Sequence, residues 1–393
     1  MSRIPSLVDV FVVGGGPAGL AAAIAARRRG MSVVVADGAI PPIDKACGEG
    51  LMPDGLAALR ELGVEIPGDE VYRFRGIRFV SGGRKVEAEF AQGVGYGMRR
   101  TTLHRILLEY AAWCGVCLLW KTPITGLNSE DGSVQFAGAR VRARWIVGAD
   151  GTNSRVRRWA RIDRQPQKKV RFGFRRHYRV APWSEFMELY WGGDCRDDAC
   201  QIYVTPVGRE EVCVALVSSN PEVRVDAALA QFPELAARIG GAEDVSAERG
   251  AITVNRKLGR VYRGRTVLVG DASGGVDAIT GEGLCLAFRE AALLADCLCN
   301  GNLAHRNLAD GNLAGGSLAR YQVEHRRLMR RPTLMAELML LMGNSRGLRQ
   351  RTMQVFERSP RLFAGMLAMH VGEGSARDYI ANGISTGWRL LTT

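Results

Sequence analysis

Glycine-rich turns far apart in this chain of 393 residues have the residue types that bind a phosphorylated cofactor. The first turn, GGGPAG at positions 14–19, follows a short apolar run and precedes an alanine-rich stretch, an order that predicts strand, tight turn and helix. Gly14 then allows the turn, Gly16 lets the backbone approach a pyrophosphate, and Gly19 lets helix and strand pack closely. The N–H groups and the dipole at the start of such a helix favour an anion.

An acidic residue completes this unit. A second apolar strand, 32–36, ends at Asp37, close to the spacing of roughly 20 residues at which an acid meets a ribose hydroxyl. A lone glycine motif is often an ordinary loop, but strand, helix and terminal acid together predict a dinucleotide site. This unit alone leaves NAD and FAD as alternatives.

The later part of the chain predicts an interleaved architecture. Further glycine turns, at 148–151 (GADG) and 270–272 (GDA), each end an apolar strand pattern, and together with the first turn they argue for FAD. We expect an α/β fold with an α+β insertion, in which a Rossmann-like FAD-binding domain is assembled from several segments. The expected segments are 1–71, 99–162 and 258–310 for the FAD-binding domain, 72–98 and 163–257 for an inserted, mostly antiparallel substrate domain, and 311–393 for a C-terminal helical region.

Composition places the chain among ordinary globular enzymes, with 47% hydrophobic and 24% charged residues. No apolar run is long enough to span a bilayer and no signal peptide is evident, so we expect a cytoplasmic protein. The nine cysteines are irregularly spaced, which favours free thiols. Cys114 and Cys117 are expected to straddle a helix-to-strand turn, and no metal site is predicted.

The net charge of +13 raises the question whether the protein binds nucleic acid. Basic residues are dense between Arg155 and Arg179 and again around Arg326 to Arg331, but no nucleic-acid-binding signature accompanies them, so specific nucleic-acid binding is not expected. A phosphorylated cofactor, an acyl-carrier partner, an anionic lipid surface or a solvated face are the alternatives.

In their order, the three turns resemble the fingerprints of the flavoprotein superfamily that contains aromatic hydroxylases, which are flavin monooxygenases, and geranylgeranyl reductases. The resemblance extends to about residue 297 and implies that the turns hold the ADP part of FAD, touch the cofactor near the nicotinamide entry, and place Asp271 against the ribityl chain. The cofactor-binding residues that it implies are Gly14, Gly16, Pro17, Ala18, Gly19, Asp37, Gly48, Arg100, Asp150, Gly270, Asp271, Gly281, Glu282, Gly283 and Leu284.

Residues 280–283 (TGEG) and 45–50 (KACGEG) resemble the geranylgeranyl reductase branch more than the hydroxylases. Two features differ from that branch, because Ala278 stands where many members have proline and no aromatic-proline substrate signature is evident. The resemblance places Cys47 and Glu49 near the flavin, where they are candidate proton-handling residues. His177 is a third catalytic candidate, on a strand of the expected substrate sheet. Arg99 competes with Arg100 for the cofactor phosphates.

We therefore expect an FAD-dependent oxidoreductase in which flavin reduced by NAD(P)H reduces a carbon–carbon double bond of an apolar, isoprenoid or polyketide-like substrate. No second dinucleotide motif is visible for the nicotinamide, so transient binding or a protein electron donor is expected. The substrate is free or carrier-bound, and methionines over 318–372 form either a helical core or a flexible apolar rim with peripheral membrane contact. The alternatives are a monooxygenase hydroxylating an aromatic or polyketide-like substrate through a flavin hydroperoxide, and a non-catalytic FAD-fold binding protein.

Overall fold

Short runs of valine, isoleucine and alanine form the sheet on which the first lobe is built. The computed structural model describes residues 6–162, 170–192, 200–300 and 311–373, together with residues 383, 385 and 389. The strands of this sheet follow the order β18-β19-β11-β1-β2-β8. Their bounds are β1 (Leu7–Val13), β2 (Val33–Ala36), β8 (Cys117–Leu119), β11 (Ala139–Gly148), β18 (Tyr262–Arg263) and β19 (Thr266–Leu268).

The centre of this sheet is parallel and buried. β1 pairs in parallel with β2 and β11, and β8 and β19 extend the parallel set on either side. All residues of β2 are buried, as expected for parallel strands that are covered on both faces. β9 (Ile124–Asn128) and β10 (Ser133–Phe136) add an antiparallel ribbon to β11.

Helices pack on this sheet around α1 (Pro17–Arg28), which contacts both α3 (Arg100–Trp113) and α7 (Gly283–Asn300). α1 begins at Pro17, a residue suited to the first helical position, and nine of its 12 residues are buried. α2 (Pro53–Glu61) packs on α7, and α4 (Arg155–Trp159) packs near β9.

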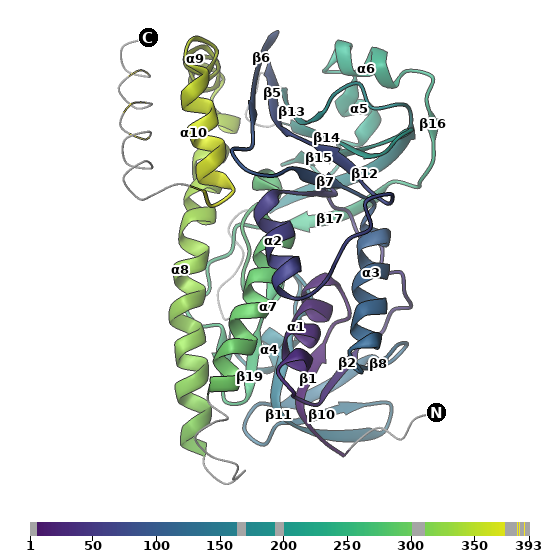
Figure 1. Ribbon diagram of the computed structural model, residues 1–393, viewed down its shortest axis with the longest axis vertical. Coiled ribbons are helices and arrows are strands. Elements are labelled where there is room, and N and C mark those ends of the chain that lie inside the picture. Colours follow the sequence, from purple (N-terminus) through teal and green to yellow (C-terminus); the bar gives the residue numbers. More distant parts are fainter. Residues whose placement is uncertain are drawn as a thin grey trace.

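The second lobe, at the top of Figure 1, is built on a mostly antiparallel sheet, which we call the large sheet. Its order is β16-β12-β15-β14-β13-β5-β6, with β17 paired to β12. Among the described strands of this sheet, only β13 and β5 pair in parallel. α5 (Val225–Leu229) and α6 (Pro233–Ile239) supply apolar residues to the core on one face. The strands are β5 (Gly76–Ser81), β6 (Arg84–Glu89), β12 (Arg171–Arg179), β13 (Phe186–Gly192), β14 (Cys200–Gly208), β15 (Glu211–Ser218), β16 (Glu243–Asp244) and β17 (Arg249–Thr253).

A small three-stranded sheet lies at the junction of the lobes, in the order β3-β7-β4. It contains β3 (Gly50–Leu51), β4 (Tyr72–Phe74) and β7 (Gly95–Gly97). β7 approaches β14 so closely that a Cβ on Gly97 would lie 1.8 Å from the carbonyl oxygen of Pro206. Only glycine allows this approach.

The C-terminal helices are α8 (Gly311–Asn344), α9 (Arg346–Arg358) and α10 (Pro360–His370). α8 runs along one side of the molecule from the first lobe to the second (Figure 1). Its buried methionines join a core with Phe79 of the sheet and Phe363 of α10. The helical core expected for this region is therefore present, and α9 and α10 close the face of the sheet opposite α5 and α6.

The α/β class, the split Rossmann-like lobe, the inserted sheet and the C-terminal helices are confirmed. Cys114 and Cys117 straddle a helix-to-strand turn at Gly115, whose φ is 78°. Within the segment 72–98, only β5 and β6 join the large sheet, because β7 pairs with β3 and β4 pairs with β7 instead. The expected boundaries at 163 and 310 fall on residues outside the described ranges, and the domain boundaries stay predictions.

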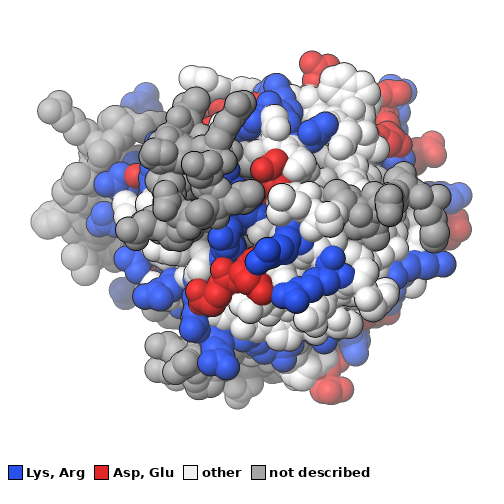
Figure 2. All heavy atoms as spheres, turned by 90° about the horizontal axis from the view of Figure 1, so that it is seen from below, with Lys and Arg blue, Asp and Glu red and all other residues white. Residues whose placement is uncertain are grey.

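Charge on the lower face of the molecule is mixed. Figure 2 shows Lys and Arg side chains spread over this face with Asp and Glu among them. Among the ion pairs of the described residues is that of Arg140 with Asp131, whose closest atoms are 2.8 Å apart. Among the described residues, no helix has the length and apolarity needed to cross a membrane.

The junction of the lobes gives a first prediction. Gly97→Ala should destabilise the protein by about 3 kcal/mol, because the new methyl group forces β7 away from β14. The measurement is the midpoint of urea unfolding, with Gly259→Ala as the control, since a Cβ there meets no atom within 4 Å. Equal midpoints for the two variants would show that β7 does not need this close approach.

Candidate active site

The first glycine turn has the geometry of a phosphate cradle. Gly14 has a φ of 111°, and a Cβ there would lie 2.5 Å from the carbonyl oxygen of Ala149. A Cβ on Gly19 would lie 1.9 Å from the oxygen of Gly14. Gly16 is the N-cap residue of α1, and no side chain caps the first N–H groups of the helix. The space into which a Cβ on Gly16 would project is open. The uncapped helix start can therefore receive a phosphate.

Asp37 lies at the end of β2 beside this turn. Its Oδ2 accepts a hydrogen bond of 2.7 Å from the N–H of Gly15, and its Oδ1 accepts one of 2.8 Å from Ala39. These bonds fix the carboxylate against the glycine turn, at the position where the sequence predicts a ribose contact. The contact with ribose itself stays a prediction.

The two candidate arginines have different surroundings. Arg99 makes a bidentate ion pair with Glu211, with contacts of 2.5 and 2.8 Å. The Nε of Arg100 is buried and has no hydrogen-bond partner among the described residues. A buried guanidinium N–H without an acceptor suits a phosphate oxygen, so Arg100 rather than Arg99 fits the cofactor.

His104 also belongs to this site, although it was not among the residues predicted from the sequence. Its Nε2 lies 2.8 Å from the carbonyl oxygen of Gly15, to which it must donate. Burial lowers the pKa of His104, which favours the neutral ring. Its spacing of four residues from Arg100, one helical turn along α3, is the signal that could have revealed it.

The second fingerprint is held by a network of local hydrogen bonds. Asp150 accepts from the Ser154 hydroxyl (2.5 Å) and from the N–H groups of Arg155 (2.6 Å) and Val156 (3.0 Å). The carboxylate therefore caps α4, and a side-chain contact of Asp150 with the cofactor stays a prediction. The buried Arg157 donates to the carbonyl oxygens of Thr152 and Ala272, at 2.8 and 3.0 Å, and so ties this fingerprint to the third.

The third fingerprint forms the 3-10 turn η1 (Gly270–Ser273), which Glu290 holds from below. The Oε2 of Glu290 accepts a hydrogen bond of 2.6 Å from the N–H of Gly270. The same carboxylate accepts a hydrogen bond from the Ser273 hydroxyl. Asp271 is half exposed, with Lys45 Nζ at 3.4 Å and the Thr152 hydroxyl at 3.1 Å. Three segments distant in sequence thus converge on Asp271, where the ribityl contact is predicted.

The glycines after this turn leave open space beside a buried acid. A Cβ on Gly281 or Gly283 would meet no atom within 4 Å. Between them, Glu282 is buried and its Oε2 has no hydrogen-bond partner among the described residues. Burial raises the pKa of Glu282 and Asp54 adds to the rise, whereas His370 lowers it. Leu284 lies in the first turn of α7.

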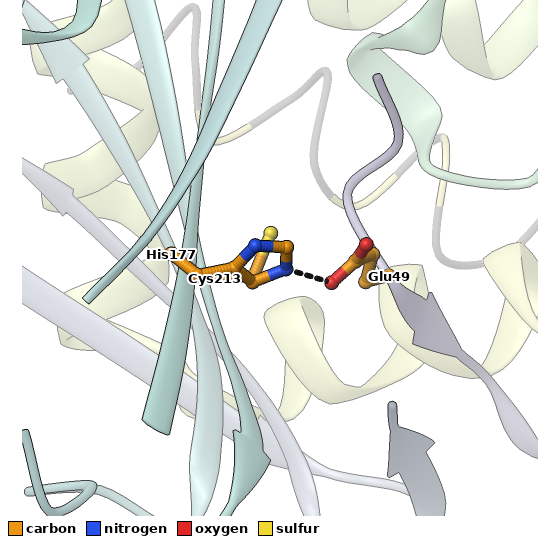
Figure 3. Close-up of side chains that lie close together, drawn as sticks. All are labelled: Glu49, His177 and Cys213. Atoms are coloured by element: carbon orange, nitrogen blue, oxygen red, sulfur yellow. Dashed lines mark hydrogen bonds and ion pairs between the residues drawn. The ribbon is translucent and has the colours of Figure 1, made fainter. Parts of the chain in front are cut away.

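Glu49 and His177, two of the three catalytic candidates, form a buried pair. The Nε2 of His177 lies 2.6 Å from the Oε2 of Glu49, and both side chains are almost fully buried. Figure 3 shows His177 and Cys213 reaching from the large sheet toward Glu49, which lies on the loop before β3. Glu49 has a φ of 59°, a conformation that non-glycine residues adopt at a cost.

The proton of this pair can be assigned from its neighbours. The buried Arg175, which can only donate, has its Nη1 3.2 Å from the Nδ1 of His177. In a neutral ring Nδ1 therefore accepts, and Nε2 carries the proton that it donates to Glu49. The other oxygen of Glu49 accepts from the N–H of Arg100 at 2.9 Å.

Glu49, His177 and Cys213 also meet a distance criterion for holding a metal ion, since one ligand atom from each lies within 4.8 Å of the others. A metal on Nε2 would require removal of the proton that faces Glu49, next to the buried guanidinium of Arg175. Burial raises the pKa of Cys213 well above its ordinary value, whereas a metal binds the thiolate. These observations favour a hydrogen-bonded pair over a metal centre.

Cys47 and Gly48 lie on the same loop as Glu49. The Cys47 side chain is half-buried, and its sulfur lies 3.4 Å from the N–H of Glu49. The carbonyl oxygen of Gly48 accepts a hydrogen bond of 2.6 Å from Thr205 of β14. The loop is therefore attached to the large sheet at two neighbouring residues, through Gly48 and Glu49.

Comparison with known proteins decides the family. The sequence model of a family described as FAD binding domain matches residues 7–301. The chain belongs to this FAD-binding family. A digeranylgeranylglycerophospholipid reductase from Methanosarcina acetivorans is 30% identical over 304 residues, covering 71% of this chain and 72% of the relative. A menaquinone reductase from Mycolicibacterium smegmatis is 28% identical, covering 75% and 77%.

Solved structures show the same fold. A geranylgeranyl bacteriochlorophyll reductase-like protein from Thermoplasma acidophilum superimposes with a TM-score of 0.75 at 19% identity, covering 98% of each chain. PqsL, a probable FAD-dependent monooxygenase from Pseudomonas aeruginosa, gives 0.64 at 22% identity, covering 86% of this chain and 94% of PqsL. The chain is an FAD-dependent oxidoreductase, and its FAD cofactor agrees with the uncapped start of α1 and with the Nε of Arg100, which has no partner among the described residues.

Arg100 gives a second prediction. Arg100→Met should weaken FAD binding about tenfold to a hundredfold, because it removes a charged hydrogen bond to phosphate worth about 1.5–3 kcal/mol. Arg99→Met is the matched control and should change affinity little, since Arg99 pairs with Glu211. Titration of the FAD-free protein with FAD, followed by flavin fluorescence, measures both. A larger loss in the control would reverse the assignment.

Glu282 gives a third prediction, on stability against pH. Because the pKa of Glu282 is raised in the folded protein, its stabilising contribution is present at low pH and is lost as pH rises through the folded pKa. Glu282→Gln cannot ionise, so its melting temperature relative to that of wild type should increase between about pH 5 and about pH 8. Parallel melting curves across this range would contradict the direction of the shift.

Proposed function

We propose that the protein reduces a carbon–carbon double bond of an apolar, isoprenoid or polyketide-like substrate, with NAD(P)H as the source of electrons. The observation that carries the proposal is the buried Glu49–His177 pair, which bridges the cofactor loop and the substrate sheet with one proton between two side chains. Addition of hydrogen to an alkene needs a proton as well as a hydride. The names of the relatives, which are reductases of a prenylated lipid and a quinone, support the same reaction class.

In the proposed reaction, some residues of the chain would hold FAD and others would transfer the proton. Bound FAD in its reduced form supplies the hydride, which is the chemistry of the cofactor. The phosphate turn, Arg100 and Asp271 hold FAD in place. In the form that carries one proton more than a neutral ring beside a carboxylate, the Glu49–His177 pair would supply that extra proton to the second carbon and return to the neutral ring and the carboxylate, and the half-buried Cys47 is the second candidate for this role. Ser246, whose hydroxyl lies 2.7 Å from Nδ1 of His177, could then relay a replacement proton from water to the ring.

An apolar cavity supports the substrate class. It is lined by sheet residues such as Phe79 and Leu189, by methionines of the C-terminal helices, and by Ile279 and Thr280 of η2 (Ala278–Thr280). Ile279 and Thr280 directly precede the Gly281–Gly283 loop in the sequence. A substrate held there has an apolar wall and lies next to the loop that the family resemblance assigns to the flavin.

The proposed source of electrons is NAD(P)H. NAD(P)H would bind transiently over the flavin, because the sequence carries a single dinucleotide motif. The substrate would be delivered free, from a carrier protein or by peripheral contact with a membrane, within the cytoplasm.

The test is a single-turnover experiment without oxygen. The FAD-loaded enzyme, reduced by NADPH or NADH and mixed with an unsaturated isoprenoid, should return to oxidised flavin and yield a product with two added hydrogens. Glu49→Gln should slow this step by about a hundredfold, the usual size of an acid–base contribution. The control Glu188→Gln changes another buried carboxylate, which hydrogen-bonds to Arg78, Trp183 and Tyr190 instead, and should keep the rate. A hydroxylated product that appears only after air is admitted would establish a monooxygenase instead.

A further inference from the structure

Two buried groups beside the apolar cavity are not used by the proposed chemistry. His370, the last residue of α10, lines the cavity, and its Nδ1 lies 3.6 Å from the Oε2 of Glu282. Both side chains are more than nine-tenths buried on their side-chain surface. Neither of the two facing atoms has a hydrogen-bond partner among the described residues. Buried polar atoms without partners are costly, so this pair calls for an explanation.

The hydrogen-bonding capacity of the pair can be derived. The Nε2 of His370 lies 2.8 Å from the carbonyl oxygen of Thr280 and must donate to it, so in the neutral ring Nδ1 is a free acceptor. The separation of 3.6 Å is too long for a direct hydrogen bond. One oxygen atom, however, can stand about 2.8 Å from both. If it belongs to a hydroxyl group, it donates to Nδ1 and accepts from protonated Glu282.

The cavity beside this pair is narrow and adaptable. Its volume of about 30 Å³ holds no more than one or two water molecules, far below the roughly 300 Å³ of a ligand pocket. Met187, Met335, Met339 and Met366 line it. Methionine changes shape at low cost, so an apolar chain can open the cavity by rotating these side chains.

We propose that this cavity binds the chain of an apolar substrate and that His370 and Glu282 together bind one hydroxyl group on it. The inference rests on the proposed function and narrows its substrate class to apolar molecules that carry an alcohol or phenol. It also gives α10, which lies beyond the matched residues 7–301, a direct part in specificity.

The experiment compares farnesol with farnesene, the corresponding hydrocarbon, by equilibrium binding to the FAD-loaded enzyme. His370→Phe should lower the ratio of farnesol to farnesene affinity about tenfold relative to wild type, equivalent to about 1.4 kcal/mol, and leave farnesene binding unchanged. Glu282→Leu should lower the ratio in the same way and serves if the first variant does not fold. Met366→Leu, which lines the same cavity without a polar group, should keep the wild-type ratio.

An unchanged ratio in the folded His370 variant, or no binding of either ligand to wild type, would overturn the inference. The proposed function fails in a different way. If farnesol binds with the expected dependence on His370 but reduced enzyme never hydrogenates an unsaturated isoprenoid, the binding site stands and the reductase chemistry falls.

Discussion

The buried carboxylate of Glu49 is the interaction on which the arrangement of the site depends. It accepts a hydrogen bond from the backbone of Arg100, at the start of a helix of the FAD-binding lobe, and another from His177 in the large sheet. The buried Arg175 lies beside it, at 3.6 Å. A buried carboxylate must have such partners to be tolerated, so the contacts that satisfy Glu49 also hold the two lobes in one relative position.

Buried side chains also fix the backbone segments that form the FAD site. The glycine turn, the Asp150 loop and η1 come from three separate stretches of chain, and each is fixed from below by buried groups: His104 under Gly15, Arg157 between Thr152 and Ala272, and Glu290 under Gly270. Loops held in this way stay in position without the cofactor. Preorganisation of this kind reduces the entropy lost when a ligand binds.

The sequence predicted the parts whose chemistry is local. The glycine turn with Asp37, the helix from Arg100 and the split architecture are encoded in short patterns, and the structure has them. The supporting roles of His104, Arg157 and Glu290 were not predicted, because these roles depend on contacts between segments far apart in sequence. The pairing of β4 with β7 was not predicted for the same reason. The helices α5 and α6 were not predicted because their five and seven residues are too few to show a clear helical period.

The central claim is that three separated segments hold one FAD molecule, and hydrogen–deuterium exchange with and without FAD tests it most directly. Peptides covering residues 14–19, 150–157 and 270–284 should all gain protection, with the same dependence on FAD concentration and at one FAD per chain. Protection confined to the first segment, with the other two unchanged at saturating FAD, would contradict the account.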